Sequence, residues 1–355
     1  MNNKNSYFWT CLIILILFVV FSLFFSINLG TVKIPYKEVK NVILYHFKES
    51  SFLFSGLNAK KPEGKIDDVV WLIRFPRLVL AIMVGTSLSI CGAVMQATVQ
   101  NTLAEPYVLG ISSGASLGAT LAIMLGFGNT LGGNFIGIMA FLGAFIISLM
   151  VILLSNVGGR SDAVKLLLSG LALGALCNAF ASFVIYFSPN REGMRDIAYW
   201  MMGSLAGANW KINKVLFLIT VFGVIFFLTQ SRRLNIMLLG DDTAITLGMN
   251  PSGLRQLYLL VSSLMTGFIV YAAGTIGFVG LIIPHQVRMV FGSDHKKLIP
   301  ISALLGAVFL LWADVLCRVV LPGRELPIGI LTSMIGAPCF IYLMAKKKYG
   351  FGGSH

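Results

Sequence analysis

Charged residues are scarce in this chain of 355 residues. Only 12% of the residues are charged and 57% are hydrophobic, whereas an ordinary soluble domain carries about 25% charged residues. A chain of this length and composition cannot cover its surface with polar groups. The composition therefore excludes a soluble enzyme and a disordered protein, and it indicates a protein that is solvated by lipid.

Signatures of catalysis and metal binding are also missing. The sequence contains no GxxxxGK[ST] phosphate loop, no HExxH and no GxSxG, so it lacks the motifs for ATP hydrolysis and nucleophilic chemistry. The five cysteines form no CxxC pair and lie in or beside apolar runs, as small core residues do. His285 is interpreted as a helix-end residue, with ligation of iron or haem as the alternative. We predict no enzymatic activity, no metal and no cofactor.

Basic residues outnumber acidic ones, with 27 Lys and Arg against 14 Asp and Glu. They lie mostly between the apolar runs and form no basic stripe interleaved with aromatic residues, so nucleic acid is not expected as a partner. In a membrane protein such an excess reports orientation instead, because Lys and Arg collect in cytoplasmic connections.

Long apolar runs predict an all-α, polytopic membrane protein with about ten transmembrane helices. Residues 8–29 would span about 33 Å as a helix, which is enough to cross a bilayer. Ser26-Ile27-Asn28 is a poor cleavage site, so this segment is predicted to be a retained span rather than a signal peptide. Further spans are predicted at 78–97, 107–126, 133–155, 163–187, 211–229, 254–274, 278–292, 298–320 and 327–345.

The run at 278–292 is short and contains Pro284 and Arg288, so nine spans is the alternative count. With ten spans, the short connections on the side of the N-terminus carry twice as many Lys and Arg as those on the other side. This distribution predicts that both termini are cytoplasmic. It also places residues 30–74 outside, as a surface loop or an amphipathic element.

Regularly spaced glycines predict close packing between helices. Gly110, Gly114 and Gly118 recur every four residues, as do Gly170 and Gly174. Small residues let the backbones of membrane helices touch, which is the main drive for their association. The alternative is that these glycines line a translocation path.

Two segments are weakly alike. Arg77 is followed by Gly85 and Gly92, and Arg255 is followed by Gly267 and Gly274, and the two glycines are seven positions apart in both cases. An odd number of spans separates the segments, so a duplication would be inverted, as in many transporters.

Three stretches of the sequence resemble one family, the permeases of binding-protein-dependent, ATP-driven importers for iron–siderophore complexes, haem and cobalamin. They begin at Arg74-Phe-Pro-Arg77, at Tyr199-Trp-Met-Met-Gly-Ser204 and at Gly277-Phe-Val-Gly-Leu-Ile-Ile-Pro-His285, and together they cover roughly residues 70–345. The third stretch is highly specific, since its ordered matches continue through Asp314, Arg318 and Gly336-Ala-Pro338. One departure is Thr102, where the family usually has the proline of Asn-Pro-Leu-Ala.

This resemblance implies one permease domain over residues 1–355, with ten helices and an inverted repeat, in a bacterial cytoplasmic membrane. It also implies three kinds of partner: a second permease copy, identical or paralogous, two ATP-binding subunits and an extracytoplasmic substrate-binding protein. The implied function is ATP-driven uptake of a ferric siderophore or a related iron chelate, haem or cobalamin.

The resemblance further implies that residues 234–253 form a cytoplasmic coupling segment that fits the ATPase. Gly240 and Gly248 would end short amphipathic turns, while Leu239, Ala244 and Leu247 would present an apolar face to the partner. A plain cytoplasmic loop is the alternative.

Arginines near the outer side would dock the binding protein. The resemblance implies that Arg74, Arg77 and Arg318 grip its acidic residues, since guanidinium groups pair well with carboxylates. Snorkelling at the membrane interface is the alternative for Arg74 and Arg77. Asp314 and Arg318 also have the spacing of an intrahelical ion pair.

A transporter driven by an ion gradient remains the alternative function. It would need a coupling carboxylate in mid-membrane, and Asp314 is the only candidate within a long span. An intramembrane enzyme, a third class, lacks a credible nucleophile and base.

Overall fold

The structure of the chain is a computed structural model, which describes residues 2–30, 34–50, 62, 64–126, 134–157, 159, 161–188, 191–321 and 323–345. Every regular element within these ranges is a helix, which confirms the all-α prediction. Arg160 and Lys346 to Lys348, which contributed to the predicted orientation, lie outside the described residues.

Within the described residues, seven helices are long and apolar enough to cross a membrane. They are α1 (Asn2–Asn28), α4 (Phe75–Thr98), α7 (Asn134–Ser155), α8 (Ala163–Phe187), α10 (Trp210–Thr229), α13 (Pro251–Ala273) and α15 (His295–Val319). Three predicted spans form shorter apolar helices, α5 (Ile111–Met124), α14 (Val279–Phe291) and α16 (Ile328–Ala345). A multi-pass helical membrane protein is thus confirmed, while the number of ten spans stays a prediction.

The helices that connect these spans are short. They are α2 (Tyr36–Ser50), α3 (Lys65–Asp67), η2 (Asp68–Arg74), η3 (Pro106–Leu109), α9 (Arg191–Met201), α11 (Ser231–Met237) and α12 (Asp241–Thr246). α3 and η2 continue directly into α4, so this helix begins at Lys65 rather than near residue 78 as predicted. The apolar run from Val69 to Ile73 extends the helix before Arg74.

Residues 30–74 are more than a loop. α2 buries Val39, Val42 and Ile43, and its His46 bonds to Asp67 at 2.8 Å. This confirms the amphipathic element that was predicted there; residues 31–33, 51–61 and 63 lie outside the described part.

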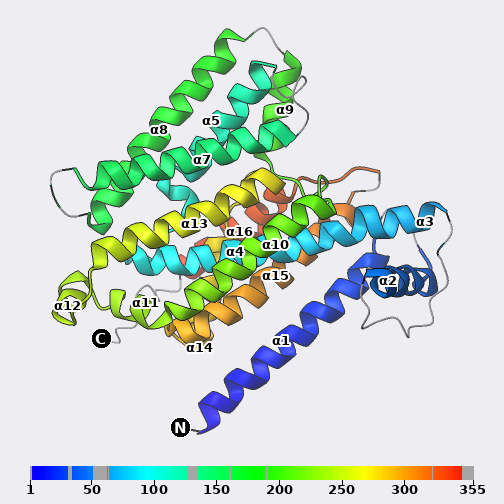
Figure 1. Cartoon of the computed structure of the whole chain (residues 1–355), viewed down its shortest axis with the longest axis horizontal. Coiled ribbons are helices and arrows are strands. Elements are labelled where there is room, and N and C mark those ends of the chain that lie inside the picture. Colours follow the sequence, from blue (N-terminus) through cyan, green and yellow to red (C-terminus); the bar gives the residue numbers. More distant parts are fainter. Residues whose placement is uncertain are drawn as a thin grey trace.

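α4 is the central helix of the bundle (Figure 1). In its membrane-length window 83% of the residues are buried, compared with 17% in α1. α4 runs antiparallel to α13, because Thr98 at its end contacts Arg255 near the start of α13, and Cys91 contacts Ser262 further along. α1 is therefore exposed to lipid over most of its length, while α4 is surrounded by protein.

Glycines bring α4 into backbone contact with its neighbours. A Cβ atom on Gly92 would overlap the carbonyl oxygen of Gly280 in α14, and one on Gly85 would overlap that of Gly306 in α15. The spaced glycines of the sequence behave in the same way. Gly110 touches α8, while Gly114 and Gly118 touch α7. The predicted packing role of these glycines is confirmed.

The bundle has two ends that matter for function. One end of the bundle holds α12. The start of α1 lies at the same end, because Tyr7 stacks on Phe291, the last residue of α14, at a centroid distance of 5.7 Å. The opposite end holds the start of α4 and the finish of α15. Arg77 and Arg255 stand at opposite ends, as an inverted repeat requires, and the repeat itself stays a prediction.

Candidate functional site

The three arginines predicted to dock a binding protein lie together at the end opposite α12. Arg77 donates to Asp314 Oδ1 from Nε and to Glu325 Oε2 from Nη1, both at 2.7 Å. Arg318 pairs with Asp314 Oδ2 at 3.1 Å, which confirms the predicted intrahelical pair. Asp314 is thus shared between two arginines from α4 and α15.

These arginines also hold the last turn of α1. Arg74 donates to the carbonyl oxygen of Ile27 and Arg318 to that of Leu29, each at 2.8 Å. The carbonyls at the C-terminal end of a helix have no partner within the helix, so the guanidinium groups satisfy them. All three arginine residues are at most 7% exposed. This burial could not be predicted from the sequence, because the residues that cover the three arginines lie far from them along the chain.

The predicted coupling segment, residues 234–253, forms α11 and α12 separated by Gly240. Gly240 and Gly248 have φ angles of 101° and 77°, a left-handed region that favours glycine. The two residues therefore mark the limits of α12, as the sequence predicted. Asn250 then caps α13 by accepting a hydrogen bond from the N–H of Gly253 at 3.2 Å, with Pro251 in the first turn.

Three large apolar side chains of this segment have no cover in the described chain. Leu239 is 62% exposed, Leu247 59% and Ile245 47%. Ala244 was predicted to belong to the same face, and this was wrong, because Ala244 is fully buried. α12 turns Ala244 inward and exposes Ile245, its neighbour in sequence.

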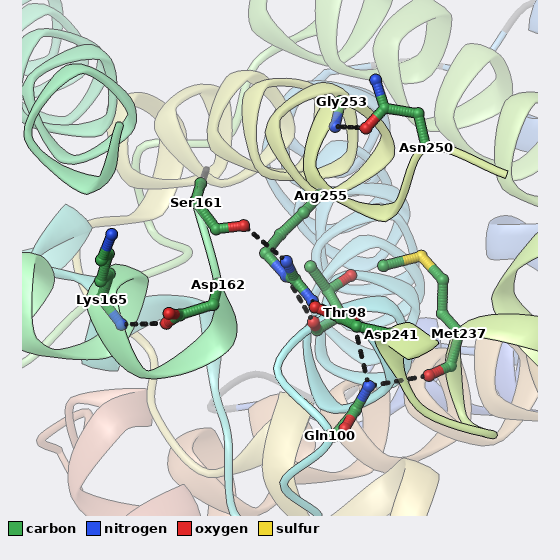
Figure 2. A network of polar contacts seen from close by, with 10 residues as sticks. All are labelled: Thr98, Gln100, Ser161, Asp162, Lys165, Met237, Asp241, Asn250, Gly253 and Arg255. Atoms are coloured by element: carbon green, nitrogen blue, oxygen red, sulfur yellow. Dashed lines mark hydrogen bonds and ion pairs between the residues drawn. The ribbon is translucent and has the colours of Figure 1, made fainter. Parts of the chain in front are cut away.

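A polar network that sequence reasoning missed lies beside α12 (Figure 2). At its centre is Arg255, which has no exposed surface and binds both carboxylate oxygens of Asp241 at 2.8 and 3.0 Å. The only signals in the sequence were an arginine early in an apolar run and two acids after Gly240.

An open pocket of about 560 Å³ lies where three short helices begin. Ser112 comes from the start of α5, Phe278 precedes α14, and Ser333 lies in the first turns of α16. Glu105 also lines this pocket, and its Oε1 atom is enclosed without a hydrogen-bond partner among the described residues. The pocket therefore offers hydroxyls and one carboxylate at the surface of the described chain.

Membrane-length helices packed into one bundle define a multi-pass membrane protein. The chain belongs to the FecCD transport family, whose sequence model matches residues 15–346. This confirms the resemblance stated above.

Curated relatives are vitamin B12 import system permease proteins. BtuC of Salmonella paratyphi A is 43% identical over 278 residues, which cover 78% of this chain and 84% of the relative. BtuC of Citrobacter koseri is 42% identical over 280 residues, which cover 79% and 83%.

Solved structures give the same fold. A metal-chelate type ABC transporter in an inward-facing conformation matches with a TM-score of 0.79 and 30% identity, covering 94% of this chain and 98% of the other. PsaBC from Streptococcus pneumoniae in complex with Fab matches with a TM-score of 0.52 and 16% identity, over 78% and 93%, which shows the fold alone. The chain is accordingly an ABC importer permease.

Replacing the shared carboxylate tests the role of the arginine cluster in stability. Asp314→Asn leaves Arg77 and Arg318 buried beside each other without their common counter-charge, so the free energy of unfolding should fall by about 3 kcal/mol. Thermal or denaturant unfolding in detergent measures this loss. The control is Glu325→Gln, whose side chain is 44% exposed and should contribute about 1 kcal/mol or less. Equal losses for the two variants would contradict the structural role of Asp314.

Proposed function

We propose that this chain is the permease subunit of an ATP-driven importer that carries a ferric siderophore, or a related chelate such as haem or cobalamin, across a bacterial cytoplasmic membrane. The observation that carries the proposal is the exposure of three apolar side chains in and beside α12, namely Leu239, Ile245 and Leu247. Exposed apolar side chains grouped on one short connecting segment are typical of a protein interface. Family membership supports the same function.

The proposed mechanism uses three partners. Two ATP-binding subunits bind residues 234–253 on the cytoplasmic side, one on each of two permease copies. A loaded substrate-binding protein docks on the opposite side. ATP binding moves the coupling segments, and the helix bundles then open the path between the two copies first to one side and then to the other.

The side chains that line the pocket of about 560 Å³ support a large polar substrate. The lining of this pocket combines methionines with hydroxyl groups and a single carboxylate, Glu105. In the described residues no group of three or more His, Cys, Asp or Glu side chains could hold a metal ion, so binding of bare iron is not favoured. The names of the relatives, vitamin B12 permeases and a metal-chelate transporter, support the wider class of metal chelates.

The ion-gradient alternative has less support. Asp314 was its candidate coupling residue, and both oxygens of this carboxylate are engaged by Arg77 and Arg318. A carboxylate held by two buried arginines is not available to bind and release a coupling ion.

Reconstitution tests the function and identifies the substrate. We expect proteoliposomes that contain the permease and its ATP-binding subunits to take up the substrate only when ATP and the loaded binding protein are present. A ferric siderophore, haem and cobalamin are each titrated into the binding protein, and the ligand that binds is used for uptake. Uptake driven by a proton or sodium gradient in vesicles without any ATPase would contradict the proposal.

Leucine truncation tests the coupling segment. Leu239→Ala and Leu247→Ala should each weaken binding of the ATP-binding subunit about tenfold, because a leucine buried at an interface contributes about 1.4 kcal/mol. Titration of the ATP-binding subunit in detergent measures the affinity. The matched control is Leu218→Ala on α10, where the side chain is 68% exposed and lies outside residues 234–253. If both leucine variants bind the ATP-binding subunit with unchanged affinity, residues 234–253 do not form the interface.

Docking of the binding protein by Arg74, Arg77 and Arg318 also stays a proposal. Because these residues are buried, docking through them requires that the partner's acids replace bonds within this chain. Arg74→Gln should then weaken binding-protein affinity about tenfold, at the level of one charge-assisted hydrogen bond, in protein whose melting temperature is matched to the wild type. Arg324→Gln, at an exposed neighbouring position, is the comparison. A larger effect at Arg324 than at Arg74 would place docking on the rim and leave the buried arginines a structural role.

A further inference from the structure

The network around Arg255 joins four separate elements through one side chain (Figure 2). Nε donates to the carbonyl oxygen of Thr98 at 3.1 Å, and Nη1 donates to that of Ser161 at 3.0 Å. Nη2 binds the carboxylate of Asp241. The guanidinium group of α13 is thereby fixed to the end of α4, to the residue before the cap of α8 and to the first residue of α12.

The two contacts that Arg255 makes with backbone carbonyls lie at helix ends. Thr98 is the last residue of α4, so its carbonyl has no partner within the helix. Ser161 precedes Asp162, which caps α8 by accepting from the N–H of Lys165 at 2.7 Å. Arg255 completes both ends, and a movement of its side chain would have to move them too.

The contact to Asp241 has a different character. The Asp241 side chain is 34% exposed, whereas that of Arg255 is fully buried. Gly240 and Gly248, on either side of α12, have open space around them, so α12 is attached to the bundle chiefly through buried Ala244 and through Asp241. The Asp241–Arg255 ion pair is thus the charged connection between the coupling segment and the three helices.

Gln100 supports the same arrangement from the other side. Its backbone has a φ angle of 52°, which a residue other than glycine rarely adopts. Its side chain donates to the carbonyl oxygen of Met237 at 3.0 Å and to Asp241 Oδ1 at 3.3 Å. The carboxylate of Asp241 therefore receives hydrogen bonds from α13 and from Gln100, the second residue after α4.

We propose that Asp241 and Arg255 are the positioning residues through which a displacement of α12 is transmitted to α4, α8 and α13. The proposal rests on the proposed function, in which an ATP-binding subunit binds α12. The exposed residues Leu239 and Leu247 bind the partner. Asp241, which lies between them in the sequence, carries the displacement to the bundle. Binding and transmission are therefore assigned to different side chains.

A neutral variant of Asp241 separates these two tasks. Asp241→Asn keeps the size of the side chain and removes the charge that holds Arg255, so the substrate taken up per ATP hydrolysed should fall about tenfold, a typical size for coupling between two sites. The affinity of the ATP-binding subunit should stay within about twofold of wild type. Both quantities are measured in the complete complex reconstituted in proteoliposomes with the binding protein.

Two further variants make the experiment decisive. Asp196→Asn is the matched control, because Asp196 lies on α9, outside residues 234–253, is exposed and receives the same chemical change; it should leave both quantities unchanged. Asp241→Glu keeps the negative charge and should stay within about threefold of wild type. This second variant also keeps the proposal falsifiable should Asp241→Asn fail to assemble.

The outcomes distinguish this proposal from the proposed function. Equal uptake per ATP in Asp241→Asn and Asp196→Asn overturns the transmission role, as does a tenfold fall in Asp241→Glu. A lower affinity for the ATP-binding subunit in Asp241→Asn with normal uptake per ATP also overturns it, because Asp241 then only holds α12 in place for binding. If the wild-type chain binds no ATP-binding subunit, the proposed function itself fails.

Discussion

The hydrocarbon core of a bilayer offers no hydrogen bonds, so every charge and every free backbone group close to it must find its partner within the protein. This chain meets the constraint with buried arginines near the starts of its two central helices. Arg77 on α4 is neutralised by Asp314 and Glu325. Arg255 on α13 is neutralised by Asp241. The two clusters lie at opposite ends of the bundle and fix the helices around them.

Each cluster performs two tasks at once. The guanidinium groups of Arg74 and Arg318 satisfy carbonyls at the end of α1, and Arg255 does the same for the end of α4. Five donors in a rigid planar group suit this use, which a lysine could not reproduce. Between the two ends the helices need no such bonds, because glycines such as Gly92 bring the backbones into direct contact.

Hydropathy was sufficient to predict the helical class and the position of each long span, because a membrane helix is a continuous apolar run. Hydropathy could not predict that the helix containing α4 begins at Lys65, since residues 65–74 mix charged and apolar residues. The Asp314–Arg318 pair was predictable from a spacing of four residues. Arg77 and Asp314 are separated by 237 residues, and no periodicity in a single sequence connects them.

The same contrast between local patterns and long-range contacts explains which site residues were predicted correctly. Gly240 and Gly248 are recognisable because glycine is needed at positive φ angles, and so the limits of α12 were correct. Which side of so short a helix faces inward depends on its neighbours in space, and Ala244 was therefore assigned to the wrong face. Arg255 was visible only as a member of a weak repeat, since its partners come from three other elements far apart in the sequence.

The fastening of α1 has a consequence for biosynthesis. The carbonyl of Leu29 receives its hydrogen bond from Arg318, which lies 289 residues later. At about 5 to 20 residues per second, a ribosome needs about 15 to 60 seconds to make that intervening length. The earliest helix to enter the bilayer thus waits there, surrounded by acyl chains, until nearly the whole polypeptide has been translated. A nascent chain stalled before α15 would lack the hydrogen bond from Arg318 and would hold its first helix through Arg74 and through contacts with α2, α4 and α14.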